Sequence, residues 1–234
     1  MNHRRPHWPR MAVAAIVAII VAQVGIAAYA VASNTTEQEP NVPIVPSQPI
    51  DAVLDLEQAA ALGLEIARQW RSDSVLVDAG MQVDWPDESI ADVPSELPRG
   101  GWALLRYLSG HEMLTLRVDR GSGVVVETEL IRLSAADAAQ LAARALDFQQ
   151  ASTTSSTAIL ATEAAYGLTY RAACPDRRRA TWISAETDGS SGQRSWYVAY
   201  RDNDDRERIT LSVRIDWASG DIFDGVNLNP NCAD

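Results

Sequence analysis

The sequence predicts an α+β fold of two repeated units, each a helix packed on a small antiparallel β-sheet, preceded by a single transmembrane helix. Three features predict it: an uncharged stretch near the N-terminus, two helical patterns, and two strand-rich segments that end in similar hairpins. The predicted parts are a cytoplasmic basic tail (1–10), a transmembrane helix or signal peptide (11–32), a proline-rich linker (33–52), and units at 53–132 and 133–234.

Apolar residues recur at helical spacing in two places. The first is Asp55–Arg71, where Asp55 or Asp51 is the expected N-cap. The second begins at Ser134, whose hydroxyl can cap the helix while Asp137 lies near its positive end. We therefore expect one amphipathic helix at the start of each unit.

Strand-like segments follow each predicted helix in the same order. In the first unit they are Ser74–Val83, Trp102–Tyr107, Leu114–Gly123 and Val124–Val126. In the second unit they are Thr157–Tyr170, which can also be partly helical, Trp196–Tyr200, Leu211–Gly220 and Ile222–Phe223. Two such units should superpose, with Trp102 and Trp196 on equivalent strands and Asp119 and Asp216 in equivalent turns.

The hairpins of the two units align without a gap. Leu116-Arg-Val-Asp119 followed by Ser122-Gly123 matches Val213-Arg-Ile-Asp216 followed by Ser219-Gly220. Both resemble the Val-x-Val-Asp-x-x-Thr-Gly ending of the PepSY family, with serine in place of threonine. The resemblance implies export-associated, non-catalytic domains, often anchored to membranes or fused to peptidase propeptides, that bind or restrain a peptidase.

The segment Met11–Ala32 carries no charge over about 22 residues, enough for a helix to cross the ~30 Å hydrocarbon core. Arg4, Arg5 and Arg10 precede it, whereas carboxylates follow, which places the N-terminus in the cytoplasm and the rest of the chain outside. Small residues at Ala28-Tyr29-Ala30 also fit a cleaved signal peptide, after which the protein would be secreted. Both alternatives place the following residues outside the cytoplasm.

The charged residues exclude several classes of function. The formal net charge of −11 repels phosphate backbones, so nucleic acid is not an expected partner. All 20 basic residues are arginine, which excludes Schiff-base and P-loop chemistry that needs lysine. Since His111 is the one histidine beyond the hydrophobic segment, we expect no histidine-based catalysis, metal site or cofactor.

Cys174 and Cys232 are the cysteines of the chain, and in an oxidising compartment such a pair predicts a disulfide. The bond would close a loop of about 58 residues and stabilise the fold by about 4 kcal/mol in the chain-entropy model.

The other candidate residues have simpler structural explanations. We expect His111 in a solvated turn, and Asp119 and Asp216 as turn formers rather than catalytic acids. The carboxylates of Asp202–Glu207 lack the EF-hand spacing for calcium, so a solvated turn is expected there. Arg177–Arg179 are expected in a solvated loop, with binding of a carboxylate or phosphate as the alternative. Most tryptophans are expected to pack in the core or on a sheet face, although one at an exposed edge would be a natural binding anchor: Trp70, Trp85, Trp102, Trp182, Trp196 and Trp217.

These features predict a non-enzymatic, membrane-tethered binding or regulatory module outside the cytoplasm, with an exported or membrane protein as its partner. One alternative is a hydrolase outside the cytoplasm that uses paired carboxylates. Another is a sensor or assembly subunit of a membrane complex.

Overall fold

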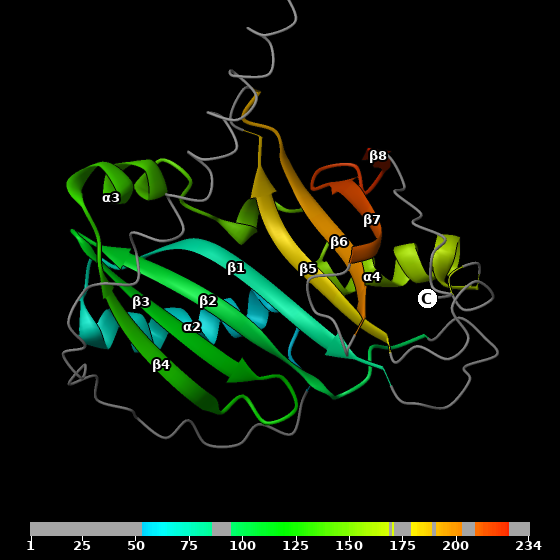
Figure 1. Ribbon diagram of the computed structural model, residues 1–234, viewed down its shortest axis with the longest axis horizontal. Helices are drawn as coiled ribbons and strands as arrows, with labels where there is room; N and C mark the ends of the chain where they lie inside the picture. The colour runs from blue at the N-terminus through cyan, green and yellow to red at the C-terminus, as the bar shows by residue number, and fades with distance from the viewer. Residues whose placement is uncertain are drawn as a thin grey trace, which may run out of the picture. The chain divides into compact units, whose positions relative to one another are not determined.

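Eight strands form one antiparallel sheet in the order β4-β3-β2-β1-β5-β6-β7-β8 (Figure 1). The computed structural model describes residues 53–85, 95–168, 170, 179–188, 191–202 and 209–224. All of them belong to one compact unit, Pro40–Asp234.

The strands are β1 (Val75–Asp84), β2 (Gly101–Ser109), β3 (Glu112–Asp119), β4 (Val125–Arg132), β5 (Arg179–Thr187), β6 (Arg194–Asp202), β7 (Ile209–Asp216) and β8 (Ile222–Asp224). The described helices are α2 (Leu56–Trp70), α3 (Ala135–Ala142) and α4 (Ser155–Thr162), with a 3₁₀ turn η2 (Phe148–Gln150) and a π-helical turn η3 (Glu163–Gly167).

The predicted fold class, two units each with its own small sheet, is wrong. β1 pairs with β5 from Gly80↔Ser184 to Asp84↔Ala180, and this pairing joins all the strands into one mainly-β structure. The physical reason is the edge of β1. Its residues are buried almost without interruption, and an unpaired edge there would leave backbone groups without partners.

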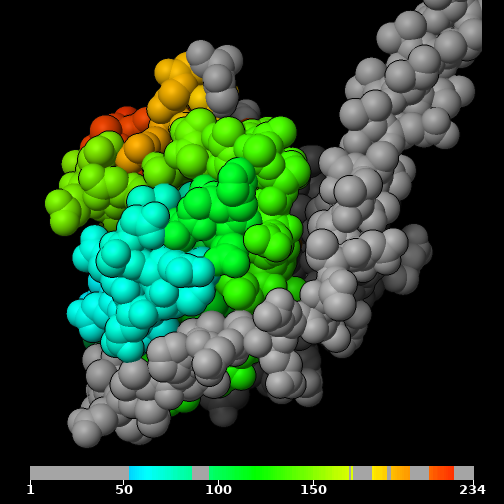
Figure 2. Space-filling model, turned by 90° about the vertical axis from the view of Figure 1, so that its left-hand side faces the viewer, coloured from blue at the N-terminus to red at the C-terminus, as the bar shows by residue number. Residues whose placement is uncertain are grey.

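The helix α2 covers one face of the first half of the sheet. Asp55 is its N-cap, as predicted, and forms a capping box with Gln58. In the space-filling view of Figure 2, the cyan residues, which include α2, lie beside the green residues that follow them in the chain. Gly63 allows this close approach, because the hydroxyl of Tyr107 on β2 reaches past it to donate to the Ala60 carbonyl at 2.7 Å.

The helix that corresponds to α2 in the second half is α4, not the helix predicted from Ser134. The segment Thr157–Tyr170 was expected as a strand or as partly helical, and the helical alternative is the correct one, because this segment forms most of α4 and the turn η3. The helix predicted from Ser134 is present as α3, with Ser134 as its N-cap. It packs on the opposite face of the sheet, where Ala138 contacts Val77 and Leu108.

The two halves of the sheet share local contacts. Before α2, the Leu54 N–H donates to the Arg120 carbonyl at 3.0 Å. Before α4, the Thr153 N–H donates to the Trp217 carbonyl at 3.1 Å. Arg120 and Trp217 each follow the aspartate that ends a strand, so the β3–β4 and β7–β8 turns hold the two helices in the same way.

Trp102 and Trp196 lie on β2 and β6, the corresponding strands, but on opposite faces. Trp102 pairs with Asp119, whereas Ser195 is the residue that pairs with Asp216. The register of Trp196 is therefore shifted by one residue relative to that of Trp102, which turns its side chain to the opposite face. Trp196 is fully buried in the core, while Trp102 is half-buried.

The predicted basic tail, membrane segment Met11–Ala32 and linker lie outside the described residues. Within the described part of the chain, no helix is long and apolar enough to cross a membrane.

Candidate functional site

The sheet has one face packed under α2 and α4 and a second face that we call the open face. Leu105, Leu116, Ile183 and Val213 belong to the core beneath the helices. Side chains alternate along a strand, so their neighbours point to the open face. Among the described elements α3 packs on one end of this face.

Two tryptophans lie side by side at the centre of the open face. The ring centroids of Trp102 and Trp182 are 5.6 Å apart, and both residues are register partners of Gln82 on β1. Gly80 provides the space for the second ring, since a Cβ at this position would overlap Trp182. We call Trp102, Gln82 and Trp182 the aromatic platform.

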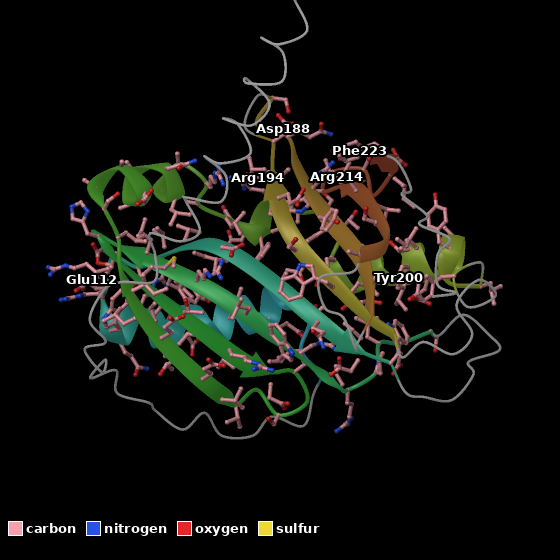
Figure 3. The ribbon with its side chains drawn as sticks, viewed as in Figure 1. Glu112, Asp188, Arg194, Tyr200, Arg214 and Phe223 are labelled. Carbon is pink, nitrogen blue, oxygen red and sulfur yellow. The ribbon has the colours of Figure 1, made fainter. Side chains whose placement is uncertain are left out.

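An arginine lies over an aromatic ring on each side of the platform. The guanidinium carbon of Arg117 on β3 is 4.5 Å from the ring centroid of Trp102. That of Arg214 on β7 is 5.7 Å from the ring centroid of Tyr197. Arg214 is labelled in Figure 3. These contacts orient both arginines and combine a cation with a flat apolar surface.

Each of these arginines also contacts a carboxylate. Arg117 Nη1 lies 3.5 Å from Glu127, and Arg214 Nε donates to Glu186 at 3.0 Å. The open face therefore presents paired charges and aromatic rings rather than an excess of one sign.

A cleft opens beside the platform where β1 and β5 separate. Toward the N-terminal end of β1, the pairing of the two strands stops at Gly80↔Ser184. In this part of β1, which does not pair with β5, the Leu76 carbonyl accepts a hydrogen bond from the Leu146 N–H at 2.8 Å. We call this place the fork and the cavity on it the fork cleft. Its volume is about 480 Å³, and its lining comes from β1, β2, β3, β5 and the segment from α3 to Leu146.

The structure places the predicted turn residues as expected. His111 is exposed in the β2–β3 turn. Asp119 accepts from the Ser122 N–H at 2.9 Å, and Asp216 accepts from the Ser219 N–H at 2.8 Å. A hydrogen bond from the Gln193 side chain is the largest of the effects that hold the pKa of Asp216 below its ordinary value of 3.8. These aspartates build turns, as predicted.

Several predicted sites lie outside the described residues. They include both cysteines of the predicted disulfide, Cys174 and Cys232, and the arginines Arg177 and Arg178. Of the acidic run, Asp202 ends β6 and the rest also lies outside. Within the described ranges no group of three or more His, Cys, Asp or Glu side chains could hold a metal ion.

Sequence reasoning missed a buried arginine that joins three segments. Arg120 is fully buried and donates to the carbonyls of Leu54, Pro98 and Gly100 at 3.0, 3.1 and 2.9 Å. Burial lowers the pKa of its guanidinium to about 10. The surrounding Asp-Arg-Gly-Ser-Gly sequence carried only a turn signal, because the acceptors are backbone carbonyls far away in sequence.

The fold and the open face define a mainly-β domain with a half-exposed aromatic surface. No family model and no curated protein matches the chain. Among solved structures, one described as a candidate lipoprotein from Clostridium difficile 630 aligns with a TM-score of 0.46 and 12% identity, over 76% of this chain and 97% of that chain. This degree of likeness supports no functional assignment. The resemblance to the PepSY family thus depends on the two hairpin motifs alone.

Proposed function

We propose that the chain is a non-enzymatic binding module that works outside the cytoplasm and binds an exported protein through the open face of its sheet. The N-terminal hydrophobic segment would tether the module to the membrane or direct its secretion. The single observation that carries the proposal is the aromatic platform, with its stacked arginine.

The residue types on the open face are those that dominate protein–protein binding energy. Trp, Tyr and Arg are enriched at binding hot spots, where they form the centre of the contact. Here these residues are half-buried rather than covered, and they lie on β2, β5, β6, β3 and β7 of the same sheet: Trp102, Trp182, Tyr197, Arg117 and Arg214. A partner could bury the rest of their surface with little ordering cost, because their mutual contacts already restrict their rotamers.

The paired charges support binding more than hydrolysis. A paired-carboxylate hydrolase needs two carboxyl groups that face a substrate. Glu186 on the open face instead accepts from Arg214, and Asp78 accepts from Arg106 at 2.7 Å. Both carboxylates thus have structural partners, and the hydrolase remains the weaker alternative.

A peptidase is the partner class to test first, because the PepSY resemblance implies it. A membrane complex is the other class, and it would correspond to the sensor or assembly alternative. Both would bind the same open face, so one experiment addresses both.

The test is site-specific photo-crosslinking in the cells that produce the protein. A photoreactive amino acid replaces Leu104 on the open face of the full-length chain, or Arg68 on the exposed side of α2 as the matched control. We expect a discrete crosslinked protein from position 104 and none from position 68. Equal crosslinking from both positions, or none from position 104, would contradict the proposal.

A further inference from the structure

The fork cleft has a lining that differs from the aromatic platform. Its apolar side chains come from strands and from the α3 segment: Val77, Met113, Leu141 and Leu146. Its polar lining residues come from β1, β2, β5 and the segment after α3: Asp78, Arg106, Arg144, Ser184, Glu186 and Thr187. A cavity of about 480 Å³ with this mixture has the size and composition of a small-ligand site.

The two acidic side chains of the cleft are already neutralised. Arg106 Nη1 donates to Asp78 at 2.7 Å, and Arg214 Nε donates to Glu186 at 3.0 Å. A cationic ligand would therefore have to displace an arginine from each carboxylate before it could bind.

The hydrogen-bond donors of the cleft, in contrast, have capacity left. Among the described residues, no acceptor binds the guanidinium of Arg144 or the hydroxyl of Ser184. Arg106 keeps 40% of its side chain exposed, and its buried Nε has no acceptor. The cleft thus offers donors and one uncompensated positive charge, which suit a carboxylate.

We propose that the fork cleft binds a carboxylate that carries an apolar group. Arg144 supplies the charge, and Ser184 offers a hydroxyl donor to a carboxylate oxygen. The apolar group packs on Val77, Met113 and the α3 segment. The C-terminal residue of a peptide and a short acyl chain share this chemistry, and the experiment distinguishes them.

The test measures binding of small probes to the full-length protein in detergent by titration calorimetry. N-acetyl-leucine represents a peptide C-terminus, and hexanoate represents an acyl chain. N-acetyl-leucinamide lacks the carboxylate, and acetate lacks the apolar group. We expect saturable binding of at least one of the two apolar acids, with dissociation constants of about 1 mM, and at least tenfold weaker binding of the amide and of acetate. Tighter binding of N-acetyl-leucine would identify the ligand as a peptide C-terminus, and tighter binding of hexanoate would identify it as an acyl chain.

Variants locate the binding in the cleft. Arg144→Gln should weaken acid binding about tenfold or more, and Ser184→Ala should weaken it severalfold, because each loses a donor. Arg68→Gln removes the same charge from the far side of the sheet and should leave binding unchanged. Equal binding of acid and amide, equal losses in Arg144→Gln and Arg68→Gln, or no binding of either acid at about 20 mM would each overturn the proposal. The platform could still bind a protein in that event, because it does not include these residues.

Discussion

Glu57 and Ser155 join the N-termini of α2 and α4, which belong to different halves of the sheet. The Ser155 N–H donates to Glu57 Oε1 at 2.7 Å, and the Ser155 hydroxyl donates to Oε2 at 2.5 Å. The same hydroxyl accepts from the Leu56 N–H at 3.0 Å. Each helix thus satisfies a free N–H group of the other, which the helices cannot do within themselves.

This contact predicts a pH-dependent stability. Burial is the largest cause that raises the pKa of the Glu57 carboxyl above its ordinary value of 4.5. The Glu57 carboxyl loses its proton at a lower pH in the unfolded chain than in the folded protein. The free energy of unfolding therefore falls as pH rises from 4.5 to the raised pKa of the folded state. The neutral variant Glu57→Gln lacks this loss.

Urea unfolding of both proteins between about pH 4 and 7 checks this expectation. The unfolding free energy of the wild type relative to Glu57→Gln should decrease as pH rises. A difference that is constant with pH, or one that increases with pH, would show that burial does not dominate the ionisation of Glu57.

Arg120→Met should destabilise the fold strongly. It retains an apolar stem but removes the donors to three carbonyls, at Leu54, Pro98 and Gly100. We expect a loss of about 3 kcal/mol in the free energy of unfolding, measured by denaturant titration. The control Arg132→Met, at an exposed strand end, should stay within about 0.5 kcal/mol. Similar losses in both variants would mean that charge alone accounts for the effect.

Gly63→Ala should destabilise the fold although alanine favours helices by about 1 kcal/mol. A Cβ at this position would lie 2.5 Å from the Tyr107 hydroxyl oxygen and 2.8 Å from Leu105 Cδ1, so α2 must move away from β2. We expect a net loss of about 1–3 kcal/mol.

A double-mutant cycle with Tyr107→Phe tests the cause of this loss. Phenylalanine removes the hydroxyl that lies closest to the new Cβ. Gly63→Ala should therefore cost less in the Tyr107→Phe background than in the wild type. If the losses in the free energy of unfolding of the two variants simply add, the strain does not come from the contact between the new Cβ and the Tyr107 hydroxyl.

The sequence predicted the strands of the first half better than their assembly. Alternating apolar residues and tight turns are local signals, and the strands near Ser74–Val83 and Trp102–Tyr107 are present as β1 and β2. The pairing of β1 with β5 has no local signal, because it joins segments about a hundred residues apart. The sequence leaves α4 open between a strand and a partly helical segment, because its short run of Thr, Ala and Ile residues has no clear helical apolar stripe.

The candidate site was predictable only in its residue types. The tryptophans were recognised as packing residues or anchors, but the faces they occupy depend on register. The connection between β2 and β3 is short, because their pairing continues to Ser109↔Glu112. The connection between β6 and β7 is longer, because their pairing ends at Arg201↔Ile209. The two tryptophans therefore differ by one residue in their register with the next strand, and a shift of one residue places their side chains on opposite faces. The fork cleft also depends on long-range pairing and carried no signal in the sequence.

The affinity of the crosslinked partner for tryptophan variants tests the binding proposal most directly. Trp182→Ala and Trp102→Ala each remove one ring of the platform, while Trp70→Ala removes a half-buried tryptophan from α2 as a control. The thermal midpoints of all three variants first establish that they are folded. We predict that each platform variant weakens binding about thirtyfold, as expected for a hot spot worth about 2 kcal/mol, and that Trp70→Ala does not. Unchanged affinity in both folded platform variants would contradict the open face as the binding surface.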